Sequence, residues 1–303
     1  MKILFLNPNQ INKYNWGHQL FRNEIGRQHN VLYYGEGFPG FNKEWPVKRI
    51  IKKRYKNDKP DLIMTYGWRY SKNFRGLGEI DIPKVHFVVD YGRPGGIPKQ
   101  NKFMRRNQYD LLFSITQNAH RLLNENIPEI LNFILPFSVD INVYKKINIK
   151  KEDIVLAAFN TRSDIYPNRE KIQKALKQMG VRAITKKIVH QKLIHAINRC
   201  KITVTSNNIF RSLSMRYTET LACGGFLLAN EPEDLKYLGF KDGKHLVIYN
   251  GINDFKEKVK FYMKNDSSRE AICKQGMKFV RKNHSCKVRV QQMTDIIKSE
   301  LQI

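Results

Sequence analysis

Short, uninterrupted runs of apolar residues recur along the chain, and they constrain its fold more than any other feature. The runs of the first half cover residues 2–6, 31–34, 61–66, 85–90 and 110–115. Such runs are typical of parallel strands, which are buried on both faces. The segments between them have helical patterns, as in strand–helix–strand units with right-handed crossovers. The sequence therefore predicts an α/β fold built on parallel sheets.

The same alternation starts again in the second half. A strand at 133–140 is expected to lead into a Lys-rich joint at 145–153. The strands expected beyond the joint cover residues 154–159, 182–185, 202–205, 226–229 and 246–249. The helices expected there cover residues 169–179, 190–199, 214–223, 254–264, 267–283 and 286–301.

A chain of 303 residues can fill two cores of ordinary size, so two domains are expected. Residues 1–140 form the first Rossmann-like domain and residues 141–285 the second. The helix within 286–303 is expected to pack near the domain junction.

The formal net charge is +27, with 54 Lys and Arg against 27 Asp and Glu. A surplus of this size favours a polyanionic partner such as nucleic acid, an anionic glycan or an anionic membrane surface. Part of this positive charge is concentrated in a helix expected within residues 47–59. The alternative explanation of the charge surplus is genome composition, because an AT-rich genome encodes many Lys, Asn and Ile residues without selection for binding.

The chain is expected to be a soluble, cytoplasmic protein. No apolar stretch is long enough to span a membrane, and the run at 2–6 is too short for a signal peptide. The four cysteines lack Cys-x-x-Cys spacing, so neither a disulfide framework nor a zinc site is indicated. The glycines after the first strand do not form Gly-x-Gly-x-x-Gly, so no dinucleotide cofactor is assigned.

The stretch 214–230 carries the clearest functional pattern. A helix over 214–223 ends at Gly224-Gly225 and a buried strand follows. Arg216 and Glu219 are three residues apart and therefore share one face near the start of the helix. An Arg suits phosphate oxygens and a carboxylate suits ribose hydroxyls. An isolated Arg-x-x-Glu is more often a surface ion pair, and the Gly pair with its strand favours the binding interpretation.

Two further groups of residues stand at the carboxyl ends of expected strands. Arg162 and Arg169 follow the first strand of the second half and are candidates for binding a diphosphate. Asp90 ends a buried strand before a Gly- and Pro-rich loop, where a carboxylate is placed to act as a general base or to cap the loop. The candidates for contact with an acceptor are Trp16, Gly17, His18, Arg93, Lys99 and Arg105.

Together these residues resemble the two-domain glycosyltransferases of the GT-B fold, in particular the CgeB-like glycosyltransferases of the group 1 family. The resemblance is best over residues 84–303, and the segments that carry it are 135–140, 216–225, 242–244, and His284 with Arg289. It implies two Rossmann-like domains that face each other across a cleft. The first domain would serve the acceptor and the second would bind a nucleotide sugar.

A weaker resemblance connects the chain with the phage DNA beta-glucosyltransferases. It implies that Asp90 is the base, that Arg162, Arg169 and Arg216 hold the diphosphate, and that Glu219 holds the ribose. The chain departs from retaining members of the wider fold at Arg211, where they carry Glu, and at Asn160, where Gly is usual. The stereochemical outcome stays open, with inversion through Asp90 preferred.

The resemblance implies transfer of a sugar from a nucleoside diphosphate, with a UDP-sugar such as UDP-glucose as the expected donor, to an acceptor hydroxyl. The acceptor is a modified base in phage DNA or a cell-surface glycan. No tightly bound cofactor is implied, and a divalent metal is compatible with the sequence without being required by it. The alternatives are an inactive GT-B protein that binds nucleic acid or another polyanion, and a nucleotide-sugar epimerase.

Overall fold

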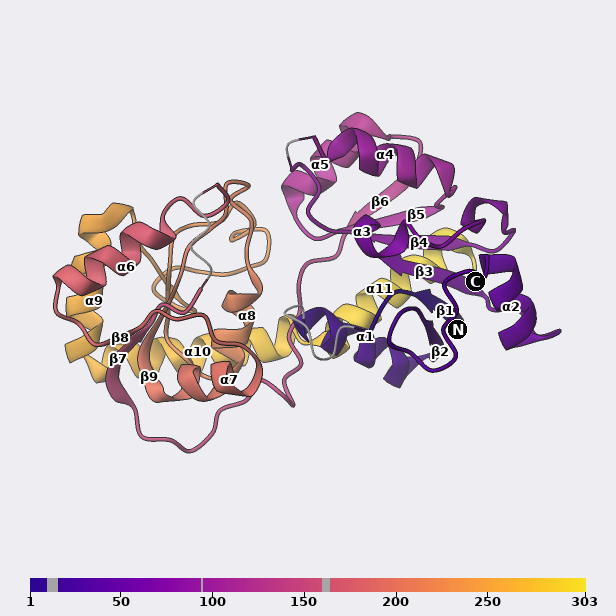
Figure 1. The fold of residues 1–303 in the computed structure, drawn as a ribbon. Coiled ribbons are helices and arrows are strands. Elements are labelled where there is room, and N and C mark those ends of the chain that lie inside the picture. Colours follow the sequence, from indigo (N-terminus) through magenta and orange to yellow (C-terminus); the bar gives the residue numbers. More distant parts are fainter. Residues whose placement is uncertain (10–15, 94, 160–163) are drawn as a thin grey trace. The chain divides into compact units, whose positions relative to one another are not determined.

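The structure, a computed structural model, describes residues 1–9, 16–93, 95–159 and 164–303 (Figure 1). The chain forms two compact units. Unit 1 comprises Met1–Pro136 together with Arg289–Ile303, and unit 2 comprises Phe137–Val288. The last helix, α11 (Cys286–Leu301), begins in unit 2 and continues into unit 1. Each unit is built around one parallel sheet, which confirms the predicted α/β class.

The sheet of unit 1 has six parallel strands in the order β2-β1-β3-β4-β5-β6. Its strands are β1 (Lys2–Leu6), β2 (Asn30–Tyr34), β3 (Leu62–Tyr66), β4 (Lys84–Val88), β5 (Leu111–Ser114) and β6 (Leu131–Ile134). The strand order reverses at β1, because β2 lies on one side of it and β3 on the other. In open parallel sheets, the carboxyl ends of the strands at such a reversal are the usual place for a ligand.

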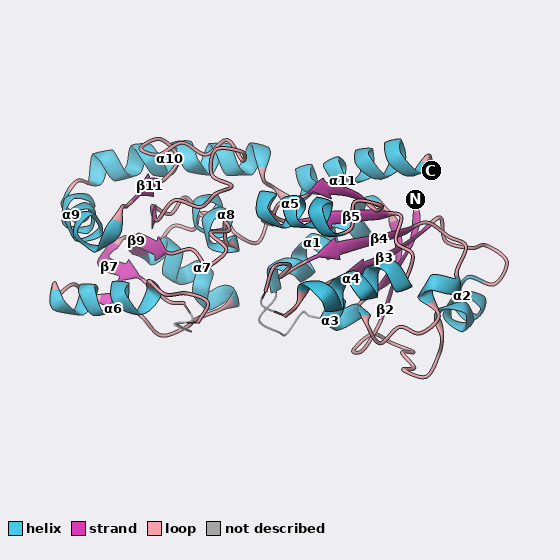
Figure 2. Cartoon of the chain, turned by 90° about the horizontal axis from the view of Figure 1, so that it is seen from above, coloured by secondary structure: helices cyan, strands magenta, loops and turns pink. Residues whose placement is uncertain are grey.

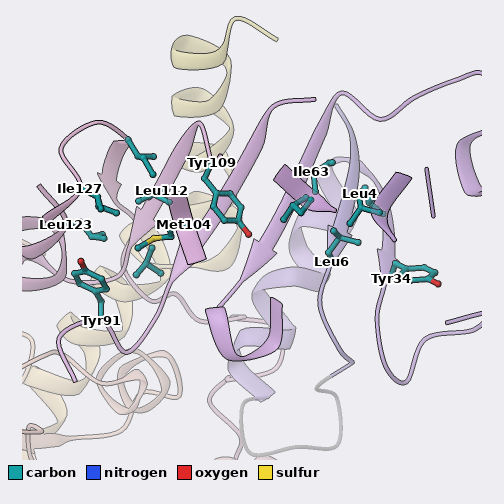
Figure 3. Packing of buried hydrophobic residues seen from close by; sticks show 14 of the residues in the cluster. Leu4, Leu6, Tyr34, Ile63, Tyr91, Met104, Tyr109, Leu112, Leu123 and Ile127 are labelled. Carbon is teal, nitrogen blue, oxygen red and sulfur yellow. The ribbon is translucent and has the colours of Figure 1, made fainter. Parts of the chain in front are cut away.

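Helices cover both faces of this sheet. One face carries α2 (Val47–Tyr55), α4 (Ile97–Arg106) and α5 (Gln117–Asn126), whose apolar residues share a core with strand residues such as Leu4, Ile63 and Leu112 (Figure 3). On the other face α1 (Trp16–Gln28) places Phe21 edge-on against Phe87 of β4. The α11 helix joins α1 through a 2.8 Å hydrogen bond between Thr294 Oγ1 and His29 Nε2.

The sheet of unit 2 has five parallel strands in the order β11-β10-β9-β7-β8. They are β7 (Glu152–Leu156), β8 (Ala183–Ile184), β9 (Cys200–Thr205), β10 (Leu227–Ala229) and β11 (Val247–Ile248). One core is formed by these strands with α6 (Arg169–Gln178), α9 (Gly251–Lys264) and α10 (Asp266–Asn283) (Figure 2). The remaining helices of the unit, α7 (His190–Arg199) and α8 (Met215–Ala222), contact β9.

The structure corrects two expectations and adds elements that were not predicted. The Gly- and Pro-rich segment 91–98 was expected to exclude a helix, but α4 begins at Ile97 with Pro98 in its first turn, where the missing N–H of Pro costs no helical hydrogen bond. The strand expected at 133–140 ends at Ile134. The additions are α3 (Trp68–Ser71), a 3₁₀ turn at Leu77–Glu79, and α5.

None of the helices in the described parts of the chain combines the length and apolar character that crossing a bilayer requires.

Candidate functional site

Helix α8 presents Arg216 and Glu219 together, as their spacing predicts. Arg216 is the second residue of the helix, and its Nε lies 3.5 Å from Oε2 of Glu219. Both side chains are largely buried, and Glu219 is 8 % exposed. The helix ends before Gly224, whose φ of +66° lies in the left-handed region that Gly adopts without strain. A Cβ at Gly225 would lie 2.7 Å from Ile197 Cγ2, so this Gly allows α7 and the strand to approach closely.

Arg169, the first residue of α6, follows β7 through the loop that also contains Arg162. Arg162 itself lies outside the described residues. The guanidinium carbon of Arg169 lies 3.4 Å from the ring centre of Tyr166 and 5.1 Å from that of Phe159. Its Nη2 donates to the carbonyl oxygen of Ser206 at 3.4 Å. The two rings and the carbonyl therefore hold the guanidinium at the carboxyl ends of β7 and β9.

The charges of Arg169 and Arg216 affect each other. Burial lowers the pKa of Arg169 to about 10, and the positive charge of Arg216 contributes to that lowering. The positive charges of the two guanidinium groups repel each other. The N-terminus of α8 adds partial positive charge, and its first turn contains no acidic residue. This end of the sheet therefore concentrates positive charge.

Two buried hydroxyls lie in the connection from β9 to α8. The side-chain oxygens of Ser206 and Ser214 are buried and have no hydrogen-bond partner among the described residues. Ser214 stands at the N-cap of α8 but makes no side-chain cap. Buried hydroxyls without partners are costly unless a ligand or water completes them. A polar ligand at this place would supply the missing partner.

Sequence reasoning missed two aromatic residues of this site. Tyr166 stacks on Arg169, and Tyr144 donates a 2.9 Å hydrogen bond from its hydroxyl to Glu219 Oε1. Tyr144 lies in the segment that joins the units, 75 residues before Glu219. Nothing in the spacing of the sequence connects the two residues. Tyr166 is only three residues before Arg169, in a loop expected to bind an anion, so an aromatic partner could have been considered.

In unit 1 the structure brings Asp90 and Arg93 together just after β4. Arg93 Nη2 lies 3.1 Å from Asp90 Oδ1, and the carboxylate side chain of Asp90 is 54 % exposed. The backbone of Asp90 has a φ of +56°, a left-handed conformation that is uncommon outside Gly. Strained backbone of this kind often occurs at functional sites. The carboxylate is thus accessible and fixed in direction by its own loop.

The other cations expected on this loop lie farther along α4. Lys99 is exposed in the first turn of the helix. Arg105 lies in the last turn, where its Nε contacts Glu129 at 2.6 Å and its Nη2 donates to the Asn126 carbonyl. Six residues of helix, about 9 Å, separate the two cations along the helix axis. Arg105 is therefore held by Glu129 at the far end of the helix from Lys99.

Trp16, Gly17 and His18 form the first turn of α1, beside a buried arginine that was not predicted. His18 Nδ1 is hydrogen-bonded to the hydroxyl of Tyr66, and burial lowers the pKa of His18 to about 3, with a further contribution from Arg22. Arg22 is 1 % exposed and donates to Gln19 Oε1 at 2.7 Å and to the Pro8 carbonyl at 3.2 Å.

Both of these acceptors of the Arg22 guanidinium are neutral groups. Burial lowers the pKa of Arg22 to about 10, so it remains charged at neutral pH. The carboxyl end of β1 therefore holds a buried positive charge beside a neutral imidazole.

Within the described ranges, no group of three or more His, Cys, Asp or Glu side chains is arranged to hold a metal ion.

Solved structures that match both parallel-sheet units define the fold class. Sucrose-phosphate synthase from Thermosynechococcus elongatus is 11 % identical over 100 % of both chains, with a TM-score of 0.67. Anabaena HepE, solved in complex with UDP-glucose, is 12 % identical over 99 % of this chain and 100 % of its own, with a TM-score of 0.70.

An alpha-glucosyltransferase solved with UDP and a 13-mer DNA is 12 % identical over 98 % of both chains, with a TM-score of 0.68. At these identities the similarity establishes the fold, which is the predicted GT-B fold.

A family model matches the second part of the sequence. Residues 156–295 match the family described as glycosyl transferase-like, a segment that includes Arg169, Arg216 and Glu219 but not Asp90. The protein is therefore a glycosyltransferase with the GT-B fold, as its sequence predicts. No curated protein sequence matches the chain.

Proposed function

We propose that the protein transfers a sugar from a UDP-sugar to an acceptor hydroxyl. One observation carries the donor assignment: Arg169, Arg216 and the N-terminus of α8 gather positive charge at the carboxyl ends of β7 and β9. Arg216 already faces the Glu219 carboxylate at 3.5 Å, and a diphosphate would supply a further counter-charge to both Arg216 and Arg169. Glu219, on the same helix, supplies the acceptor that a ribose diol requires. The solved neighbours that contain UDP or UDP-glucose support uracil as the base of the donor nucleotide.

The proposed reaction divides the chemistry between the units. Asp90 accepts the proton of the acceptor hydroxyl, whose oxygen then attacks the anomeric carbon and displaces UDP with inversion. Arg93 fixes the direction of the Asp90 carboxylate. Arg169 and Arg216, together with Arg162, stabilise the negative charge that develops on the leaving diphosphate. These guanidinium groups would serve where other enzymes use a divalent metal.

Donor binding and turnover test these roles separately. Arg216→Gln and Glu219→Ala should each weaken UDP binding tenfold or more in calorimetry, since a hydrogen bond to a charged group is worth about 1.5–3 kcal/mol. Asp90→Asn should abolish turnover of UDP-glucose while UDP affinity stays at the wild-type value.

Surface variants serve as controls for both measurements. Arg182→Gln and Glu257→Ala in unit 2 and Asp81→Asn in unit 1 should change neither binding nor turnover. Wild-type UDP affinity in the Arg216 and Glu219 variants would contradict the proposed donor site. Near-normal turnover in Asp90→Asn would exclude Asp90 as the catalytic base.

We further propose that the acceptor is polyanionic, because α2 has an unusual exposed face. Its Lys48, Lys52 and Lys53 are exposed and form no ion pair with any described residue, while Val47, Ile50 and Ile51 on the opposite face are buried. The neighbouring Arg49 stacks on Trp45, with its guanidinium carbon 5.0 Å from the ring centre. Nucleic acid fits such a surface, and an anionic cell-surface glycan is the alternative acceptor. A protein that binds the polyanion without turnover would show α2-dependent binding and no use of UDP-glucose.

A further inference from the structure

The carboxylate proposed to hold the ribose is itself held by a residue from outside the α8 motif. Tyr144 is 3 % exposed, and its hydroxyl lies 2.9 Å from Glu219 Oε1. An ionised carboxylate only accepts hydrogen bonds, so the Tyr144 hydroxyl donates. Burial and the charge of Glu219 both raise the pKa of Tyr144 far above neutrality, so the donor keeps its proton at any working pH.

The two oxygens of the Glu219 carboxylate therefore have different surroundings. Oε1 accepts from Tyr144, whereas Oε2 lies 3.5 Å from Arg216 Nε, which is longer than a good hydrogen bond. The hydrogen bond to Tyr144 keeps the carboxylate from rotating into a close, bidentate pair with Arg216. Such a pair would occupy both groups that the donor needs, because Arg216 would lose its free edge and Glu219 its free lone pairs.

The position of Tyr144 is fixed by its own segment. Its backbone N–H donates to the Asp140 carbonyl at 2.8 Å, and the Asn142 N–H donates to Asp140 Oδ1 at 2.9 Å. Upstream, Val139 N–H donates to the His284 carbonyl at 3.1 Å, and Cys286 N–H donates back to the Val139 carbonyl at 2.9 Å. A tight turn anchored to the end of α10 and the start of α11 thus delivers the hydroxyl to Glu219.

We infer that Tyr144 is a positioning residue that sets the selectivity of this site for a ribonucleotide donor over one that lacks ribose hydroxyls. This inference rests on the proposed donor site. Tyr144 does not touch the donor in this scheme; it holds the Glu219 carboxylate in the orientation that accepts from the ribose diol. Its removal should therefore lower affinity only for ligands that carry the diol.

The test compares two probes, UDP and 2′,3′-dideoxy-UDP, on the full chain by calorimetry. The wild type should prefer UDP by tenfold or more. Tyr144→Phe should bind UDP about tenfold more weakly and dideoxy-UDP unchanged, so the preference largely disappears. Glu219→Gln should lose the same preference, and adding Tyr144→Phe to it should reduce the preference no further.

Tyr249→Phe is the matched control, because Tyr249 is also buried in unit 2 and donates its hydroxyl to a backbone carbonyl, that of Thr205, at 3.3 Å. It should leave the preference for UDP unchanged even if it lowers the melting temperature. Tyr144→His keeps a ring N–H donor, and a preference between those of the wild type and Tyr144→Phe would support positioning by hydrogen bonding.

The failure of this inference differs from the failure of the donor site. A wild type that binds neither probe refutes the donor site itself. A wild type that prefers UDP, with Tyr144→Phe and Tyr144→His both keeping the full preference, overturns the role of Tyr144 alone. If Tyr144→Phe does not fold, the result with Tyr144→His decides.

Discussion

Mild acid should destabilise unit 1 because two histidines are held neutral in its interior. His86 is fully buried on β4, with Nδ1 hydrogen-bonded to Thr65 Oγ1 at 2.6 Å and with no hydrogen-bond partner for Nε2 among the described residues. Burial lowers the pKa of His86 from 6.5 to about 3. His18 in α1 reaches the same value through burial and the nearby charge of Arg22. Neither ring can bind a proton at pH 5 and stay buried in the folded unit.

The magnitude follows from proton linkage. In the unfolded chain both imidazoles bind protons below pH 6.5, whereas in the folded chain they stay neutral until about pH 3. The unfolded state then binds more protons, so the free energy of unfolding falls as the pH falls from 6.5 toward 3. The slope is about 1.4 kcal/mol per pH unit for each histidine. From pH 7 to pH 5 the two together cost about 4 kcal/mol, a large part of a typical domain stability of about 5–15 kcal/mol.

Tryptophan fluorescence can follow the unfolding of unit 1 separately from that of unit 2. All three tryptophans, Trp16, Trp45 and Trp68, belong to unit 1, so their emission during urea titration reports on its unfolding. His86→Phe keeps an aromatic ring against Phe103 and Tyr109 but cannot titrate, and it should remove about 1.4 kcal/mol per pH unit from the slope between pH 6 and pH 5. His120→Gln, at a partly exposed ring of α5, should keep the wild-type slope. A stability of unit 1 that is flat from pH 7 to pH 5, or an equal slope in His86→Phe, would refute the reasoning.

Two further predictions concern packing and charge. Gly276→Ala should destabilise unit 2 by about 1–3 kcal/mol in denaturant unfolding, because a Cβ would overlap the His245 carbonyl and lie 3.0 Å from Leu221 Cδ2. This overlap should outweigh the preference of Ala for helices, which is about 1 kcal/mol. Lys274→Ala at an exposed position of the same helix is the control, and a Gly276→Ala variant that is more stable than the wild type would contradict the packing. The double variant Lys48→Gln with Lys52→Gln should bind duplex DNA with a weaker salt dependence: the slope of log K against log salt should fall by about 0.9 for each Lys removed. The control double variant Lys274→Gln with Lys278→Gln should keep the wild-type slope. Equal slopes in the two double variants would exclude α2 from the contact with DNA.

Much of the fold could be predicted because parallel strands are buried on both faces. The run from Leu62 to Tyr66 is apolar except for Thr65, and each such run forms a strand to within a few residues of its expected bounds. The misses have local causes. The α5 helix is polar along most of its length, and its start signal is a single cap in which Thr116 accepts from the Ala119 N–H. The α4 helix begins within a Gly- and Pro-rich loop because Pro tolerates the first turn.

The site shows where local spacing stops being informative. Arg216 and Glu219 are neighbours because helical periodicity places residues three apart on one face, so their 3.5 Å approach follows from the sequence. The hydrogen bond between Tyr144 and Glu219 depends on the turn at Asp140 and on where that segment meets α8. The burial of Arg22 likewise depends on how α1 packs. Such tertiary contacts leave no periodic trace in the sequence.

Burial of charge separates the two kinds of cation in this protein. The Lys residues of α2 are solvated, so each costs little and their presence alone is compatible with composition bias. Arg169 and Arg22 are different, because each residue is almost fully buried and the desolvation of a buried charge is costly. Arg169 repels Arg216, and Arg22 donates to the neutral Pro8 carbonyl and Gln19 amide oxygen. A surplus of Lys codons does not explain buried arginines held in place by specific partners. Composition therefore does not account for the small buried fraction of the total of +27, and in unit 2 this fraction lies at the proposed diphosphate site.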